Sequence, residues 1–207
     1  MILFRYRLAR HVARNWRSFA IRRKHFFLCL LGQVEIAPGA VIEPAASIWL
    51  GSDRKRPWLL RVGSGSRVKD HAYLAPRTGF IDIGSGSTIN PFCVLLGYGG
   101  ITIGNNVRIA AHCSIVAFSH NFDNVEQPIA HQGNNWRGIV IEDDVWIGTG
   151  VRVLDGVRIG KGAVVGAGSV VNRPIPAYAI AVGAPARVVR QRDASGVSPA
   201  VGMALED

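Results

Sequence analysis

The sequence has little of what a disulfide-stabilised or membrane-spanning protein needs. Its three cysteines, Cys29, Cys93 and Cys113, are odd in number and include no CxxC pair. A disulfide framework is therefore not expected, whereas a reducing, cytoplasmic compartment is. The longest uninterrupted apolar run near the start, residues 26–31, is far shorter than the about 20 residues of a membrane span. Arginines interrupt the first apolar residues, so no secretory signal is expected either.

Aromatic and acidic residues are also scarce. Aromatic residues make up 8% of the 207 residues, so the core must be built from Ile, Val, Leu and Ala, and the length predicts one domain. Residues 1–31 contain no acid but seven arginines and Lys24, which concentrates the formal net charge of +10 at the start. The 24 glycines favour many short strands with tight corners over a helical bundle.

An aliphatic residue recurs at intervals of six through most of the chain. A six-residue period fits neither an α-helix nor one long strand. It predicts short strands, three per turn, that stack as about six triangular coils. This aliphatic marker and the mostly small residue four positions later should both face inward. The markers form groups of three: Ile36, Ile42, Ile48; Val62, Val68, Leu74; Ile83, Ile89, Leu95; Ile103, Ile109, Ile115; Ile141, Ile147, Val153; and Ile159, Val165, Val171.

The repeat is interrupted only after the third marker of a group, which places every interruption at the same corner of the triangle. The longest interruption includes residues 120–138, which we expect to project as a loop. Loops of this length in a compact domain are usually functional or disordered. Cys93 and Cys113 occupy the small inward position, so we interpret them as core residues rather than nucleophiles. His71 and His112 fall at corners of regular coils, where a structural role is expected.

A specific resemblance lies in residues 141–190, which read IEDDVWIGTGVRVLDGVRIGKGAVVGAGSVVNRPIPAYAIAVGAPARVVR. The segment resembles the hexapeptide-repeat acyltransferases, in the branch of maltose and galactoside acetyltransferases that includes sugar and polysaccharide O-acetyltransferases. The resemblance implies an all-β, left-handed parallel β-helix over residues 32–190, a homotrimer, acetyl-CoA as co-substrate and no metal. Residues 1–31 would be a basic N-terminal helical segment and residues 191–207 a flexible tail.

The resemblance also implies which residues act. His120, in FSHN, matches the histidine that begins the family's catalytic loop, and a neutral imidazole can remove the proton of an alcohol near pH 7. His131, later in the loop, either contacts substrate or faces solvent. Asn90 and Trp146 match residues near the acceptor. An arginine guanidinium suits a phosphate because it can donate two parallel hydrogen bonds to the phosphate oxygens. The coenzyme would contact Gly148, Thr149, Ala167, Asn172, Arg173, Arg187 and Arg190.

The register of the coils gives independent support for one part of this site. Aligning successive coils places Asn90, Ala110, Gly148 and Gly166 in one column on an outer face. A column of small residues would form a shallow track for a thin ligand such as pantetheine. The alternative is that small residues merely suit tight corners or packing between copies.

The basic start of the chain reads as a helix over residues 2–21, with apolar residues on one side and arginines on another at spacings of three and four. Such a helix predicts either contact of residues 1–24 with the inner face of an anionic membrane or a cap over the open end of the β-helix. No recognition motif supports nucleic-acid binding.

These observations predict an acetyl-CoA-dependent O-acetyltransferase that acts on a sugar or on a polysaccharide or lipid-linked glycan unit, with His120 as general base. The alternatives are an N-acyltransferase of an amino-sugar and a non-catalytic β-helix scaffold subunit. A metal-dependent hydratase is disfavoured because the expected HxxxxH pair is missing. The basic, aromatic start replaces the acidic helical segment of the sugar-acetylating members, so the acceptor's identity is not transferred.

Overall fold

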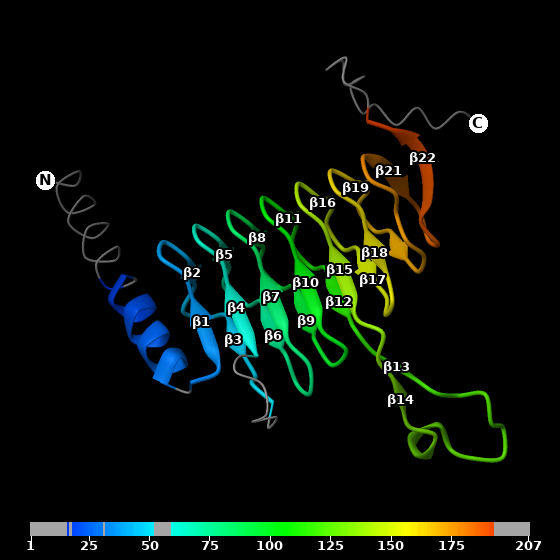
Figure 1. The fold of residues 1–207 in the computed structure, drawn as a ribbon, viewed down its shortest axis with the longest axis horizontal. Helices are drawn as coiled ribbons and strands as arrows, with labels where there is room; N and C mark the ends of the chain where they lie inside the picture. Colours follow the sequence, from blue (N-terminus) through cyan, green and yellow to red (C-terminus); the bar gives the residue numbers. More distant parts are fainter. Residues whose placement is uncertain (1–15, 17, 31, 52–58, 193–207) are drawn as a thin grey trace, which may run out of the picture.

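The computed structural model describes residues 16, 18–30, 32–51 and 59–192, and its body is a stack of triangular coils (Figure 1). Each complete coil gives one short strand to each of three sheets, and a helix precedes the first coil. This is the left-handed parallel β-helix that the resemblance implied, and its coils follow the six-residue period. Residues 1–15 and 193–207, which include nearly all of the predicted tail, lie outside the described residues.

The three sheets are numbered in the order in which the chain visits them. Sheet 1 stacks β1 (Val34–Ile36), β4 (Leu60–Val62), β7 (Ile81–Ile83), β10 (Ile101–Ile103), β15 (Ile139–Ile141) and β18 (Arg158–Ile159). Sheet 2 stacks β2 (Val41–Ile42), β5 (Arg67–Val68), β8 (Thr88–Ile89), β11 (Arg108–Ile109), β16 (Trp146–Ile147), β19 (Val164–Val165), β21 (Ala179–Val182) and β22 (Arg187–Gln191). Sheet 3 stacks β3 (Ser47–Ile48), β6 (Tyr73–Ala75), β9 (Val94–Leu96), β12 (Ser114–Val116), β17 (Arg152–Val153) and β20 (Val170–Val171). We name each corner by the sheets that it joins.

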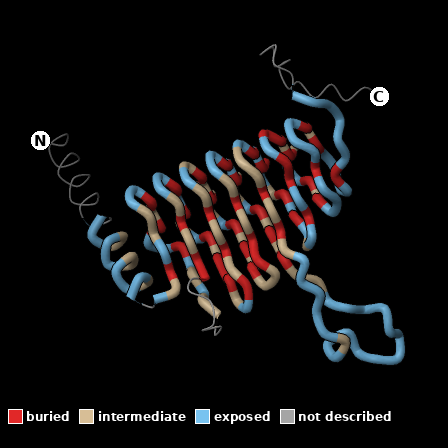
Figure 2. Tube along the Cα trace, viewed as in Figure 1, coloured by how far each residue is buried: buried red, intermediate tan, exposed pale blue. Residues whose placement is uncertain are grey.

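Equivalent markers stack directly on one another. In sheet 1 the pairing aligns Val62, Ile83, Ile103, Ile141 and Ile159, and each is at most 2% exposed. Alternate side chains of a strand lie on opposite faces, so every marker points into the triangle. Figure 2 shows buried segments recurring in coil after coil. One coil cannot cover its own apolar face, and stacking therefore builds the core.

The mostly small residue four positions after each marker is buried in every described coil at the 1–2 and 2–3 corners. Cys93 and Cys113 belong to this set, at 0% and 1% exposure, which confirms them as core residues. At the 3–1 corner the prediction is confirmed for Val157 and Ile175, which are buried, but it was wrong for Thr78, which is exposed, and for Ser119, which is half-buried. The repeat is interrupted at this corner, so the chain leaves the coil there instead of turning directly into the next inward-facing strand.

The helix over residues 18–30 packs on the first coil and caps its open edge (Figure 1). An edge strand presents unpaired backbone groups that can pair with another chain unless something covers them. Lys24 Nζ donates to the backbone oxygen of Pro44 at 3.0 Å, and His25 Nε2 accepts from the N–H of Ile42 at 3.0 Å. Residues 18–30 thus cap the β-helix, one of the two roles that the sequence predicted for this end of the chain.

The helix expected over residues 2–21 lies mostly outside the described residues. Within them, residue 16 and residues 18–30 are helical, so the helix continues well past the expected end at residue 21. None of the helices in the described part of the chain is long and apolar enough to cross a membrane.

The His25 contact predicts a pH-dependent stability. Burial lowers the pKa of His25 below its usual 6.5, because the folded cap disfavours the charged imidazole. The unfolded chain still binds this proton, so the stabilisation is complete above the ordinary pKa and is lost as the pH falls through it. We expect the free energy of unfolding to decrease between about pH 7 and pH 5, and to decrease less in His25→Gln. Urea unfolding at several pH values tests this; equal slopes for both proteins would contradict it.

Candidate active site

The 2–3 corner carries a column of small residues from successive coils. Asn90 lies at the level of β8, Gly148 and Thr149 follow β16, and Ala167 follows β19, in the register expected from the sequence. Asn90 Nδ2 donates to the backbone oxygen of Ile109 at 2.8 Å, which fixes the side chain against the next coil. Thr149 and Ala167 are exposed, whereas Gly148 is buried.

Beside the last two coils, this corner is free of bulky side chains for two reasons. A Cβ at Gly148 would come within 2.6 Å of the backbone nitrogen of Ala167 in the next coil, so Gly148 is required by packing. Gly150 and Gly168 both have a φ of +71°, which favours glycine, and a Cβ on either would meet nothing within 4 Å. Open space therefore lies against the corner beside Gly150 and Gly168, along the line where the sequence predicts the pantetheine arm of coenzyme A.

The open stretch ends at a stack of rings on the same corner. His71, Phe92 and His112 occupy the position of Gly150 in earlier coils, each with a φ of +61° or +62°. The ring of Phe92 lies between the two imidazoles, at centroid distances of 5.1 Å and 5.0 Å, and the rings are nearly parallel. The two histidines thus lie at corners, as expected. The track is open beside the last two coils and is blocked from His112, in the fourth coil, back toward the first.

The remaining predicted coenzyme contacts are divided between sheet 2 and the 3–1 corner. Arg187 and Arg190 are exposed on β22, which pairs antiparallel with β21 at the end of sheet 2. Trp146, also on sheet 2, is 56% exposed. Asn172 and Arg173 instead follow β20 and lie at the 3–1 corner. One chain therefore brings the arginines to the sheet that borders the track, but not the Asn172–Arg173 pair.

The loop expected at residues 120–138 projects from the 3–1 corner as an arm (Figure 1). Its antiparallel stem is β13 (Ser119–His120) with β14 (Asn134–Asn135), and the 3-10 helix η1 (Ile129–His131) lies farther out. His131, on η1, is exposed.

Hydrogen bonds give the arm a defined path. Gln132 Nε2 donates to the backbone oxygen of Asn124 at 2.7 Å, and Gln132 Oε1 accepts from the N–H of Asn124 at 3.0 Å. The Asp155 carboxylate, 3% exposed, accepts from the N–H groups of Arg137 (3.0 Å) and Gly138 (2.9 Å). Asp155 thereby anchors the returning end of the arm to the coils. The sequence analysis missed Asp155, because its segment, VLDGV (residues 153–157), looks like an ordinary Asp-Gly turn between two strands.

His120 lies at the base of the arm and is exposed. Its backbone pairs with Asn134, and the Phe118 ring meets its imidazole nearly at right angles, with centroids 5.7 Å apart. The imidazole is accessible to a substrate and lies outside the packed interior. Sheet 3 separates this 3–1 corner from the track at the 2–3 corner, so a single chain does not bring His120 and the track together.

A column of three rings and one guanidinium, here called the corner ladder, leads along the 3–1 corner to His120. The Cζ atom of Arg77 lies 4.7 Å from the centre of the Trp49 ring and 5.7 Å from that of Tyr98. The rings of Tyr98 and Phe118 follow at 4.6 Å. The sequence analysis missed these residues, because they stand just outside the third strand of each coil, where the six-residue period constrains nothing.

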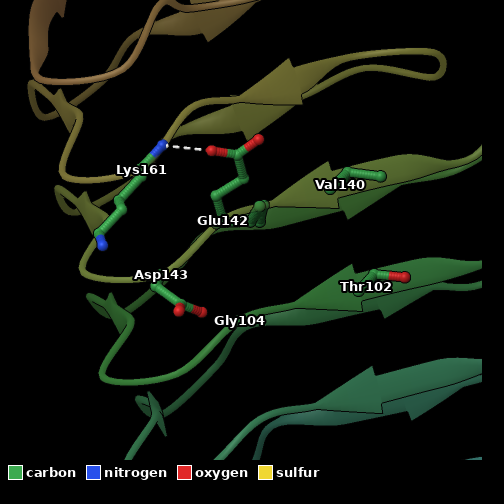
Figure 3. Close-up of a pocket in the computed structure, with 7 residues that line it drawn as sticks. Thr102, Gly104, Val140, Glu142, Asp143 and Lys161 are labelled. Carbon is green, nitrogen blue, oxygen red and sulfur yellow. Dashed lines mark hydrogen bonds between the residues drawn. The ribbon is translucent and has the colours of Figure 1, made fainter.

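A hollow of about 290 Å³ on sheet 1 contains none of the predicted site residues (Figure 3). Glu142 Oε2 accepts from the N–H of Lys161 at 2.7 Å, and Glu142 Oε1 pairs with Arg158 Nη2 at 2.5 Å. Asp143 Oδ1 accepts from the N–H of Asn105 at 2.6 Å. These carboxylates stabilise the stacking of coils. In the described ranges, no three His, Cys, Asp or Glu side chains gather as a metal site requires.

Residues 138–173 match the family model described as bacterial transferase hexapeptide (six repeats). The chain therefore carries the hexapeptide repeat of this transferase family. A Mycobacterium tuberculosis protein named a probable acetyltransferase is 31% identical over 185 residues, which are 89% of this chain and 59% of that protein. The chain thus spans less than two thirds of the curated relatives that it matches, 59% of one and 47% of another.

Two solved acyltransferase structures resemble this chain. An N-acyltransferase from Bacillus cereus, in complex with dTDP-4-amino-4,6-dideoxyglucose and coenzyme A, has a TM-score of 0.69 and 25% identity, over 82% of this chain and 89% of that one. A maltose O-acetyltransferase from Clostridium difficile has a TM-score of 0.51 and 25% identity, over 78% and 67% of the two chains.

Proposed function

We propose that the protein is an O-acetyltransferase that transfers an acetyl group from acetyl-CoA to a hydroxyl of a sugar, in a polysaccharide or lipid-linked glycan unit, and works as a homotrimer. One observation carries the proposal. The open track at the 2–3 corner ends at His112, in the fourth coil, and His120 follows the same coil at the 3–1 corner. If copies pack with parallel coil axes, the 3–1 corner of one faces the 2–3 corner of the next, and His120 reaches the end of the track.

In this arrangement the chain supplies binding, orientation and one proton acceptor. His120 takes the proton of the sugar hydroxyl as its oxygen attacks the thioester carbon. The carbon–sulfur bond breaks, and the leaving thiolate takes the proton back from the imidazolium, so no acyl-enzyme forms. Arg187 and Arg190 of the neighbouring copy hold the coenzyme phosphates through paired hydrogen bonds. Asn90 and Trp146 border the acceptor.

The exposed apolar side chains of the arm support the proposal of a trimer. Its exposed side chains include four large apolar residues: Phe122, Val125, Ile129 and Trp136, between 50% and 90% exposed. Apolar groups gathered on a projecting segment mark a contact surface, since burying them against another molecule is favourable. The arm leaves the corner that would face the next copy, so a neighbouring chain is the natural partner.

An amino group is the second candidate acceptor, because the B. cereus N-acyltransferase is similar over most of this chain. The test is thiol release from acetyl-CoA with a panel of neutral sugars and amino-sugars, followed by mild alkali treatment of the product. We expect release with a hydroxyl acceptor and an alkali-labile ester. An alkali-stable amide would favour the N-acyltransferase, and no release with any acceptor would favour the scaffold interpretation.

The outer face of the capping helix supports a peripheral membrane contact. Phe26, Phe27 and Leu30 are each more than half exposed, and Arg22 and Arg23 beside them are exposed as well. Aromatic side chains can enter the lipid interface, and each basic residue adds roughly 1 kcal/mol near an anionic surface.

We expect sedimentation with phosphatidylserine vesicles to fall at least about tenfold in the double variant Phe26→Asp/Phe27→Asp and to weaken with salt in the unmodified protein. Point substitutions are preferable to removal of residues 1–24, because Lys24 holds the helix on the first coil. Equal sedimentation of both proteins would leave the helix with its capping role alone.

A further inference from the structure

The first coils carry a groove at the 3–1 corner, at the end of the corner ladder that lies away from His120. Its volume is about 360 Å³. The groove combines aromatic walls with one cationic side chain, and its lining is Trp49, Leu50, Gly51, Arg77, Thr78 and Tyr98. No residue of the proposed coenzyme track belongs to it.

Among the described residues, Arg77 has no anionic partner in this groove. Its Nε is buried and has no hydrogen-bond acceptor, and within the described ranges no ion pair involves its guanidinium. A buried polar group without a partner costs about 1–3 kcal/mol, and more when the group is charged. A single such group in a native fold calls for an explanation, of which a ligand is one.

The surroundings of Arg77 orient it for recognition of an anion. The rings of Trp49 and Tyr98 lie 4.7 Å and 5.7 Å from its Cζ, so the guanidinium is retained by attraction to aromatic rings rather than by a carboxylate. Its planar set of N–H donors matches the paired oxygens of a phosphate or carboxylate. Arg77 is only half-buried, so its side chain is accessible from the groove.

We propose that this groove binds an anionic group, a phosphate or a carboxylate, on the sugar acceptor. The inference rests on the proposed function and specifies its acceptor as an acidic sugar. Arg77 belongs to the second coil and Phe118 to the fourth, which separates them by two coil spacings, or ~10 Å. Because the Tyr98 ring fills the level between them, a sugar would lie along the outer sides of Tyr98 and Phe118, between the bound anion and His120.

The test is calorimetric titration with glucose 1-phosphate, glucuronic acid and glucose. We expect the unmodified protein to bind at least one acidic sugar about tenfold more tightly than glucose, and Arg77→Met, which keeps the apolar stem, to lose that preference. Whichever acid binds more tightly identifies the phosphate or the carboxylate as the natural group. Arg67→Met, which removes an exposed arginine from β5 in the same coil, should keep the preference.

A second variant guards against a folding defect in Arg77→Met. Thr78→Asp places a carboxylate at an exposed position of the same groove, so it should repel the anion and pair with Arg77. Equal binding of all three sugars, or a preference that survives both substitutions, would overturn the inference. Acetyl transfer without any preference for acidic sugars would refute the groove but leave the proposed function intact. Selective binding of an acidic sugar without transfer to any acceptor would do the reverse.

Discussion

Replacement of His120 by alanine is expected to lower acetyl transfer by a factor of about 10²–10⁴, the usual cost of losing a general base. Coenzyme A binding should be nearly unchanged, because Arg187 and Arg190 lie on sheet 2 and not on the arm. The fold should also persist, since His120 is exposed. Thiol release with a verified acceptor measures the rate, and calorimetric titration with coenzyme A measures the binding.

The arm offers a matched control in His131, a second exposed histidine. His131→Ala should retain most of the activity, whereas His120→Asn should fail like His120→Ala, because an amide cannot accept the proton productively. Turnover above about a tenth of the unmodified rate in His120→Ala would show that another group is the base. Loss of coenzyme binding in a folded variant would assign His120 to positioning the coenzyme.

A tryptophan at Ala167 is expected to block the track. Ala167 is exposed at the 2–3 corner next to Gly168, where an added Cβ would meet nothing within 4 Å, so an indole there would occupy the predicted path of the pantetheine arm. Coenzyme A affinity should fall at least about tenfold, which corresponds to ~1.4 kcal/mol. The substitution lies outside the core, so the unfolding midpoint should change little.

The matched control is Ala177→Trp, which adds the same side chain at an exposed alanine of the 1–2 corner. Titration should show that this variant binds coenzyme A as tightly as the unmodified protein does. If both tryptophan variants bind coenzyme A normally, the track is not the coenzyme site, and the small residues of the 2–3 corner serve packing alone.

The fold could be predicted in detail because a six-residue period constrains nearly every inward position. Ile109 and Ile147 stack as the markers required, and Gly148 is small because the backbone of the next coil lies against it. The handedness came only from the family resemblance. The register of the coils predicted the column of the track, but the end of the track follows from the stacked rings of His71, Phe92 and His112, which only the structure shows.

The contacts that the sequence did not reveal involve residues whose positions no repeat governs. Asp155 accepts a hydrogen bond from Gly138, where the arm returns to the coils, so this contact depends on the length of the arm. Arg77 contacts the Trp49 ring from the next coil, after an insertion that the repeat does not describe. His25 reaches Ile42 because the helix lies across the first coil. Periodicity describes side chains within the stack, whereas these pairs depend on how irregular segments return to it.

The central claim is that each active site is formed between two copies, with His120 from one and the track from the next. Complementation between His120→Ala and Ala167→Trp tests it most directly, because each variant keeps the half that the other lacks. The account predicts that equal amounts, unfolded and refolded together, recover about a quarter of the unmodified activity, since random assembly of a symmetric ring gives one interface in four an intact base and an intact track. Activity no higher than that of the separately refolded variants would contradict the account and place base and track within one chain.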